Sequence, residues 1–372
     1  MDKNILITTA PFGNGHKMVA TAIKNAFNKK GYNNVVVVDL FTETHPKITE
    51  ALKKAYIKSY DFGKAYSKLY FGSEKLTDKP IVELYRNFGY RKLRSISEVF
   101  KPDVIINTFP ILASLKLKND QGKNIPVFNI VTDYYAHKLW ISKEIDKFYI
   151  ATHELREEFK KMNIPPEKIV VSGIPIREAF EEIENISKLH TKYNFKRGKR
   201  IVLINSGAFG VFKDIKKVCQ ELCRHKNIQI AVVCGNNIFL KQKLESLKLR
   251  NLRVFGFVED IHELYKIACC MITKPGGITL TEALSVQLPL IIIKPVPGQE
   301  KENALYFERK GAAIIAYNSY QLVNSTVDLI NNPELLSAMR KNMKKLYNKS
   351  SSDRIVEDVL GCLKEETQRQ ES

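Results

Sequence analysis

The sequence is poor in the residues that build disulfide-stabilised or zinc-dependent folds. Its six cysteines include no C-x-x-C pair, and no histidine stands at metal-ligand spacing beside them. This pattern argues against disulfide frameworks and zinc modules, and it favours a reducing cytoplasm and no bound metal. Cys269 and Cys270 lie in an apolar run and are predicted to be small core residues.

Long hydrophobic runs are also missing. No apolar stretch approaches the roughly 18 residues of a membrane-spanning helix, and the first residues lack the pattern of a signal peptide. Any membrane contact is therefore expected to be peripheral. Acidic residues are in deficit, because 59 Lys and Arg stand against 40 Asp and Glu, a formal charge of +19. This excess of positive charge suits nucleic acid, anionic lipid or phosphorylated small molecules as partners. The alternative is a generally basic composition that serves no specific partner.

What the sequence does contain is short apolar runs that alternate with helical patterns. They form two series, at 4–9, 34–40, 103–109, 126–133 and 147–152, and then at 200–207, 228–235, 252–257, 269–274 and 288–294. Unalternated apolar runs are typical of parallel strands buried on both faces. We therefore expect an α/β protein with two doubly wound, Rossmann-like domains that face each other across a cleft. The predicted domains are residues 1–180 and 181–350, followed by a helical tail, 351–372.

Residues 53–94 interrupt the α/β rhythm. The segment holds eleven Lys or Arg, four Asp or Glu and nine Tyr or Phe. Aromatic side chains at the headgroup level and cations facing anionic lipid would form a membrane-docking surface. The same mixture could stack nucleobases, or be a helical insert with solvated charges. Of these we favour the membrane, with no nucleic-acid partner, through Lys53, Lys54, Lys58, Lys64 and Lys68.

The first loop, "GNGH" at 13–16, stands between a strand and a helix. Such a position presents backbone amide groups and the positive end of a helix dipole, which suits a phosphate or an oxyanion. The loop lacks the Lys-Ser/Thr of a P-loop and the third glycine of a dinucleotide fingerprint. What remains is His16, which the helix dipole would keep neutral and able to accept a proton. A general base and a structural histidine both remain open at this point.

A second group of loops indicates a nucleotide-sugar site. "INSGAFG" (204–210) and "ITKPGGITLTEAL" (272–284) each read as a strand, a small-residue turn and a helix. Glu282 would lie one turn inside the second helix, where a carboxylate can accept hydrogen bonds from the two hydroxyls of a ribose. "KPVPGQEKENA" (294–304) follows with donors and acceptors that match a sugar ring. A turn suited to phosphate, a carboxylate suited to ribose and a segment suited to a sugar ring therefore follow one another along the chain.

Four motifs, "GNGHKMVATAI", "VTDYYAHKLW", "ITKPGGITLTEA" and "KPVPGQEKENA", resemble the processive diacylglycerol glucosyltransferases and the plant monogalactosyldiacylglycerol synthases. The resemblance covers residues 4–350 and extends, more distantly, to the transferase that forms lipid II. It implies a GT-B fold and an inverting transfer of glucose or galactose from a UDP-hexose to diacylglycerol, on anionic membrane lipid at the cytoplasmic face. It also implies that no metal is essential. A lipid II-type or epimerase-like enzyme and a non-enzymatic sensor of nucleotide sugars remain as alternatives.

The resemblance also implies roles for single residues. On the acceptor side, the catalytic residues would be His16, Asp133 and His137, with His16 or Asp133 as the base. Gly13, Gly15 and Trp140 would line the acceptor site. On the donor side, Glu282 would hold the ribose, and Phe257 and Val258 would read uracil through their backbone. The diphosphate would meet Arg177, Ser206, Gly207, Gly276, Gly277 and Thr279. The hexose would meet Gln299, Glu300 and Asn303.

Overall fold

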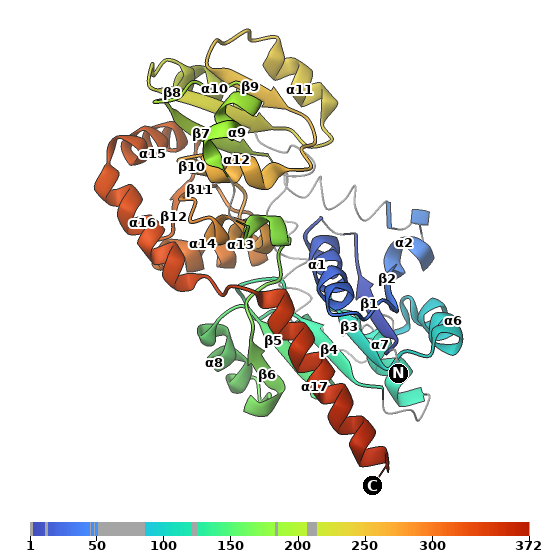
Figure 1. Ribbon diagram of the computed structural model, residues 1–372. Helices are drawn as coiled ribbons and strands as arrows, with labels where there is room; N and C mark the ends of the chain where they lie inside the picture. Colours follow the sequence, from blue (N-terminus) through green and yellow to red (C-terminus); the bar gives the residue numbers. More distant parts are fainter. Residues whose placement is uncertain are drawn as a thin grey trace. The chain divides into compact units, whose positions relative to one another are not determined.

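The computed structural model describes residues 3–11, 14–44, 46–47, 49–50, 86–120, 125–182, 185–206 and 214–371. The chain divides into two compact units. Unit 1 comprises Met1–Arg177 together with Asn348–Ser372, and unit 2 comprises Glu178–Tyr347. The division therefore falls close to residue 180, and the C-terminal segment returns to unit 1 (Figure 1).

Unit 1 is built on a parallel six-stranded sheet of order β2-β1-β3-β4-β5-β6. Its apolar runs form buried strands, as the unalternated pattern predicts; all of β1 and β3 is buried. The strands are β1 (Ile5–Thr9), β2 (Val35–Asp39), β3 (Val104–Asn107), β4 (Val127–Ile130), β5 (Lys147–Ile150) and β6 (Ile169–Val171). The α-helices are α1 (Gly15–Lys29), α2 (Leu40–Thr44), α6 (Tyr90–Phe100), α7 (Ala113–Asp120), α8 (His153–Lys161) and α17 (Ser351–Glu371).

Unit 2 repeats this plan with a parallel sheet of order β12-β11-β10-β7-β8-β9. Its strands are β7 (Arg200–Asn205), β8 (Ile228–Val233), β9 (Leu252–Phe255), β10 (Cys270–Thr273), β11 (Leu290–Ile293) and β12 (Ala313–Ala316). Its α-helices are α9 (Ile186–Lys192), α10 (Ile215–Cys223), α11 (Ile238–Glu245), α12 (Ile261–Ile267), α13 (Gly277–Ser285), α14 (Gln299–Arg309), α15 (Ser319–Asn331) and α16 (Pro333–Leu346). Cys269 and Cys270 are buried, as predicted, and all six cysteines are free.

Each sheet has a point at which the chain reverses the direction in which strands are added. In unit 1 this point lies between β1 and β3, and in unit 2 between β7 and β10. In open α/β sheets, ligands bind outside the carboxyl ends of the strands at such a reversal. Ligand sites are therefore expected at the loops after β1 and β3 and at the loops after β7 and β10.

The long C-terminal helix α17 packs against α1 and fastens the end of the chain to unit 1. Asp358 accepts hydrogen bonds from Lys147 Nζ at 2.6 Å and from Tyr149 Oη at 2.8 Å, both on β5. Gly173, at φ +82°, allows the chain to pass close to Asn348 and Ser351, because a Cβ there would lie 2.5 Å from Ser351 Oγ. These contacts make the tail an integral layer of unit 1.

No helix in the described part of the chain carries an 18-residue stretch apolar enough to cross a bilayer.

Candidate active site

His16 lies at the reversal point of unit 1, as the second residue of α1 after Gly15. The imidazole Nδ1 is 2.8 Å from the carbonyl oxygen of Thr108, which directly follows β3. It is also 3.1 Å from Thr132 Oγ1, in the loop after β4. A carbonyl oxygen can only accept, so Nδ1 must carry the ring proton. The Nε2 atom of the neutral ring is therefore the one with a free electron pair.

The protonation state of His16 is set by its surroundings. Burial lowers the pKa of the imidazole to about 4, and the hydrogen bond with Thr108 opposes that change. The ring is thus neutral at physiological pH, as the sequence predicts, but desolvation rather than the helix dipole is the main cause. A base with this pKa is always ready to accept a proton, and it is a weaker base than a free imidazole.

A buried polar network supports the loops that hold His16. Asn107, at the end of β3 and 0% exposed, accepts a hydrogen bond from Thr8 Oγ1 at 2.6 Å and donates to Asn129 Oδ1 at 2.9 Å and to Ser114 Oγ at 3.0 Å. Asn129 in turn donates to the carbonyl of Trp140 at 3.1 Å. The Thr108 hydroxyl bonds the carbonyls of Thr8 and His16. Three neighbouring strands and α1 are thereby fixed relative to the imidazole.

Asp133, His137 and Trp140 lie in the loop after β4 and are buried. The Nδ1 atom of His137 accepts a hydrogen bond from the backbone N–H of Leu139 at 3.2 Å, which caps the short 3₁₀-helix Lys138–Trp140. Trp140 is 3% exposed and belongs to the core, and Asp133 is 7% exposed. The structure therefore gives His137 a local structural role, whereas Asp133 lies one residue beyond Thr132. Gly13 lies outside the described residues.

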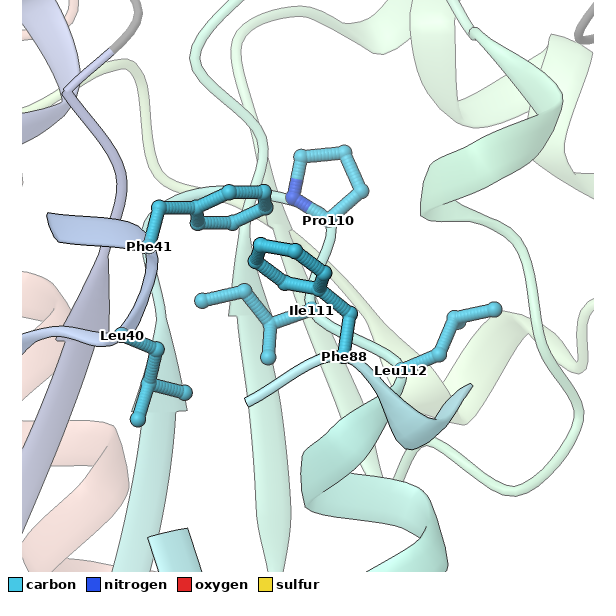
Figure 2. A pocket seen from close by; sticks show the side chains of 6 residues that line it. All are labelled: Leu40, Phe41, Phe88, Pro110, Ile111 and Leu112. Carbon is cyan, nitrogen blue, oxygen red and sulfur yellow. The ribbon is translucent and has the colours of Figure 1, made fainter. Parts of the chain in front are cut away.

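A small pocket lined by apolar side chains opens at the same edge of the unit 1 sheet. Its volume is about 10 Å³, room for about one water molecule. Its lining comes from the start of α2, the turn before α6 and the loop after β3, and consists of Leu40, Phe41, Phe88, Pro110, Ile111 and Leu112. Figure 2 shows the side chains of Phe41, Phe88 and Ile111 converging on it. Phe109 contacts both Phe41, at 5.4 Å between ring centroids, and His16, at 5.0 Å.

In unit 2 the predicted phosphate turn lies at the reversal point. Gly276 is the N-cap of α13, and Gly277 and Thr279 are in its first turn. The amide groups of such a turn are the groups that bind anions at helix N-termini. Ser206, which directly follows β7, is buried and donates its hydroxyl proton to the carbonyl of Val233 at 2.7 Å. Glu282 lies one turn into α13 and is 5% exposed. Gly207 lies outside the described residues.

The predicted sugar-reading residues form the start of α14. Gln299 is its first residue, Glu300 and Asn303 are buried, and Gly298 precedes them at φ +119°. Asn303 Nδ2 donates to the carbonyl of Pro275 at 3.2 Å, which joins the start of α14 to the turn before α13. The structure thus brings the predicted phosphate turn and the predicted sugar-binding residues together.

The other predicted residues are more dispersed. Phe257 and Val258 follow β9, and the Phe257 side chain is exposed. Arg177 is half-buried and is the last residue before unit 2 begins. Lys53, Lys54, Lys58, Lys64 and Lys68 lie outside the described residues. Within the ranges that the structure describes, no three His, Cys, Asp or Glu side chains come together as metal ligands do.

Comparison with known proteins decides the family. The monogalactosyldiacylglycerol synthase model matches residues 16–176, and the model of the glycosyltransferase family 28 C-terminal domain matches residues 206–358. A processive diacylglycerol beta-glucosyltransferase of Bacillus cereus is 46% identical over 360 residues, which are 96% of this chain and 93% of the relative. The chain belongs to the family of processive diacylglycerol beta-glucosyltransferases. A further member, from Bacillus cytotoxicus, is 44% identical over the same shares.

Solved structures with low identity confirm the fold of this glycosyltransferase. MurG of Acinetobacter baumannii is 15% identical with a TM-score of 0.65, over 96% of this chain and 99% of that one. MnaA of S. aureus, solved with UDP, is 14% identical with a TM-score of 0.64, over 98% and 97%. Anabaena HepE, solved with UDP-glucose, is 13% identical with a TM-score of 0.58, over 96% and 99%. The GT-B prediction is therefore confirmed.

Proposed function

We propose that the protein transfers glucose from UDP-glucose to the hydroxyl of diacylglycerol, with inversion, to make a β-glucosyl-diacylglycerol. The observation that carries this proposal is the 46% identity, over nearly the full chain, to enzymes named for this reaction. Transfer of further hexoses to the product belongs to the same proposal, because those relatives are named as processive. UDP-galactose is the competing donor, since it differs from UDP-glucose at a single hydroxyl.

The donor would be held by unit 2. The diphosphate would meet the amide groups of Gly276 and Gly277, with Thr279, Ser206, Gly207 and Arg177 as further donors. The Glu282 carboxylate would accept from the two ribose hydroxyls. Gln299, Glu300 and Asn303 would contact the hexose, and the backbone of Phe257 and Val258 would bind uracil. Solved neighbours with UDP or UDP-glucose support this choice of nucleotide.

The acceptor would be activated by unit 1. As the hydroxyl oxygen attacks C1 of the hexose, its proton passes to His16 Nε2, whose electron pair the Thr108 carbonyl leaves free. The C1–O bond to the diphosphate breaks, and UDP departs with the electron pair. Helix N-termini and Arg177 can stabilise the departing charge, so the reaction is proposed to need no metal. Asp133 is the second candidate for the base.

The test is transfer of labelled hexose to diacylglycerol in anionic liposomes, with EDTA present and with UDP-glucose and UDP-galactose in separate reactions. The proposal predicts labelled glycolipid from UDP-glucose in the presence of EDTA. The sizes of the products give the number of hexoses added. Hydrolysis of the donor without glycolipid would contradict diacylglycerol as the acceptor. Transfer only from UDP-galactose would contradict UDP-glucose as the donor.

Attachment to the cytoplasmic face of the membrane is a separate part of the proposal. It rests on the basic and aromatic composition of residues 53–94. Charge reversal of Lys53, Lys54, Lys58, Lys64 and Lys68 should abolish sedimentation with anionic liposomes. The control reverses five exposed lysines of unit 2, which changes the net charge equally: Lys216, Lys217, Lys243, Lys341 and Lys344. Equal loss of binding in both variants would show that total charge, and not this segment, attaches the protein.

A further inference from the structure

A central strand of the unit 2 sheet ends in a polar residue. Asn205 is the last residue of β7 and is aligned with Val233 of β8 on one side and with Thr273 of β10 on the other. It therefore lies at the reversal point of the sheet and directly precedes Ser206. Ligands bind just outside the carboxyl ends of the strands at such a point, so the position of Asn205 sets where the loop after β7 begins.

The side chain of Asn205 points to the face of the sheet that α12 covers. Successive side chains of a strand point to opposite faces, and Val202 and Ile204 belong to the apolar cluster that β7 shares with α10 and α15. Asn205 thus points to the other face, where α12 packs beside β7. There Asn205 Nδ2 donates a hydrogen bond to Tyr265 Oη at 3.0 Å. This bond joins the end of β7 to α12.

Tyr265 is itself held firmly in place. Its side chain is 1% exposed, and its ring meets Phe180 edge-on at 5.2 Å between ring centroids. The next residue, Lys266, donates from Nζ to the carbonyl of Ala179 at 2.8 Å. Ala179 and Phe180 belong to the short 3₁₀-helix with which unit 2 begins. The phenol hydroxyl is therefore fixed by a packed ring and by the anchored helix that carries it.

The start of the loop after β7 is bound on two sides. Ser206 donates to the carbonyl of Val233 twice, from its N–H at 3.2 Å and from its hydroxyl at 2.7 Å. Binding groups keep their geometry to about 0.5 Å only when the residues behind them are locked. We infer that Tyr265 is a positioning residue for the donor, because its hydroxyl fixes Asn205 and thereby the place of Ser206 beside the diphosphate. This inference rests on the proposed function, because it takes UDP-glucose as the donor.

Tyr265→Phe is the most direct test, because it removes the hydroxyl and keeps the ring that packs on Phe180. The matched control is Tyr193→Phe. Tyr193 Oη donates to Glu263 Oε2 at 2.5 Å, so the control loses a phenol hydroxyl that joins α12 to the end of α9 and not to β7. Asn205→Ala removes the other partner of the proposed pair. If Tyr265 acts through Asn205, the double variant should bind UDP no more weakly than Asn205→Ala does.

The experiment measures the dissociation constant of UDP by calorimetry and the steady-state kinetics of transfer. We expect Tyr265→Phe to raise the dissociation constant of UDP and the KM for UDP-glucose about fivefold, the factor that one net hydrogen bond contributes. The acceptor KM should stay within twofold of wild type, as should every constant of Tyr193→Phe. Thermal unfolding is recorded for each variant. A lower melting temperature in Tyr265→Phe with wild-type binding of UDP would show a merely structural hydroxyl and overturn the inference.

The outcomes separate this inference from the proposed function. Weaker binding of UDP in Tyr265→Phe, without glycolipid from the wild-type protein, would support the positioning role and contradict the proposed transfer to diacylglycerol. Glycolipid formation by the wild type, with unchanged donor constants in Tyr265→Phe, would keep the transferase and contradict the positioning role. Additive losses in the double variant would also contradict it, because the hydroxyl would then act by a route that bypasses Asn205.

Discussion

The two sheets share one architecture but present different chemistry at their carboxyl edges. Unit 2 has the Rossmann order, with three strands on one side of the reversal point and three on the other, whereas unit 1 has two and four. At the reversal point, unit 1 offers a neutral, half-buried imidazole and a chain of aromatic rings. Unit 2 offers a glycine-capped helix N-terminus and buried carboxylates. The same architecture therefore carries different side chains at its two reversal points, and these suit different ligands.

The largest expected effect tests the unit 1 half of this comparison. His16→Gln removes the proton acceptor, so kcat should fall by about 10²- to 10⁴-fold, the range for loss of a general base. The dissociation constant of UDP, measured by calorimetry, should stay within twofold of wild type. His153→Gln, at an exposed position at the start of α8, is the control. Undiminished kcat in His16→Gln would move the role of base to Asp133.

A substitution at Glu282 tests the unit 2 half of the comparison. Glu282→Gln keeps the shape of the side chain and removes the charge that would accept from two ribose hydroxyls. Hydrogen bonds to charged groups are worth about 1.5–3 kcal/mol, so the KM for UDP-glucose should rise roughly 10- to 100-fold. The acceptor KM should not change. Glu334→Gln, on the exposed first turn of α16, is the matched control. A normal donor KM in Glu282→Gln would show that this carboxylate does not bind the ribose.

A smaller effect concerns the support of the imidazole. Asn107→Leu leaves Thr8 Oγ1 and Asn129 Oδ1 without the partner that they have in the wild type, at a cost of about 2–3 kcal/mol of unfolding free energy. Trp140 is the only tryptophan, so its fluorescence in urea reports on unit 1. Gln229→Leu removes a comparable pair of hydrogen bonds in unit 2, where the Gln229 side chain bonds the backbone N–H and carbonyl of Lys196.

The Trp140 transition should shift to lower urea in Asn107→Leu and stay near its wild-type midpoint in Gln229→Leu. Equal shifts in both variants would show that the two units unfold as one, and the effect would then not be local to the support of His16.

Five strands of each sheet were predicted from the apolar runs, and the sixth was missed. The missed strands, β6 and β12, are the edge strands at one end of each sheet. β6 has only three residues, whereas β12 lies in an apolar run at 312–316 that is as long as several of the predicted strands. The order of strand, glycine-rich turn and helix was predicted at 13–16 and at 272–284, and the helices there begin at Gly15 and Gly277.

The contacts of His16 could not be predicted, because Thr108 and Thr132 are 92 and 116 residues away in the chain. A signal did exist. Asn107, Thr108 and Thr132 are polar residues at the ends of otherwise apolar runs, and Asn129 is a polar residue inside one. The carboxyl ends of parallel strands meet at one edge of a sheet, so these residues indicate a polar cluster there. The apolar pocket had no comparable signal, because its lining combines three distant segments.

The most direct test of the account is the titration of His16 itself. Protein labelled with ¹⁵N in the imidazole of histidine is followed by NMR between pH 4 and pH 8, and His16→Gln assigns the resonance. The account predicts one neutral tautomer, protonated at Nδ1, across the physiological range, with a second proton bound only as the pH falls towards about 4. A midpoint near the ordinary value of 6.5, or a proton on Nε2 at pH 7, would contradict the claim that unit 1 holds a ready proton acceptor.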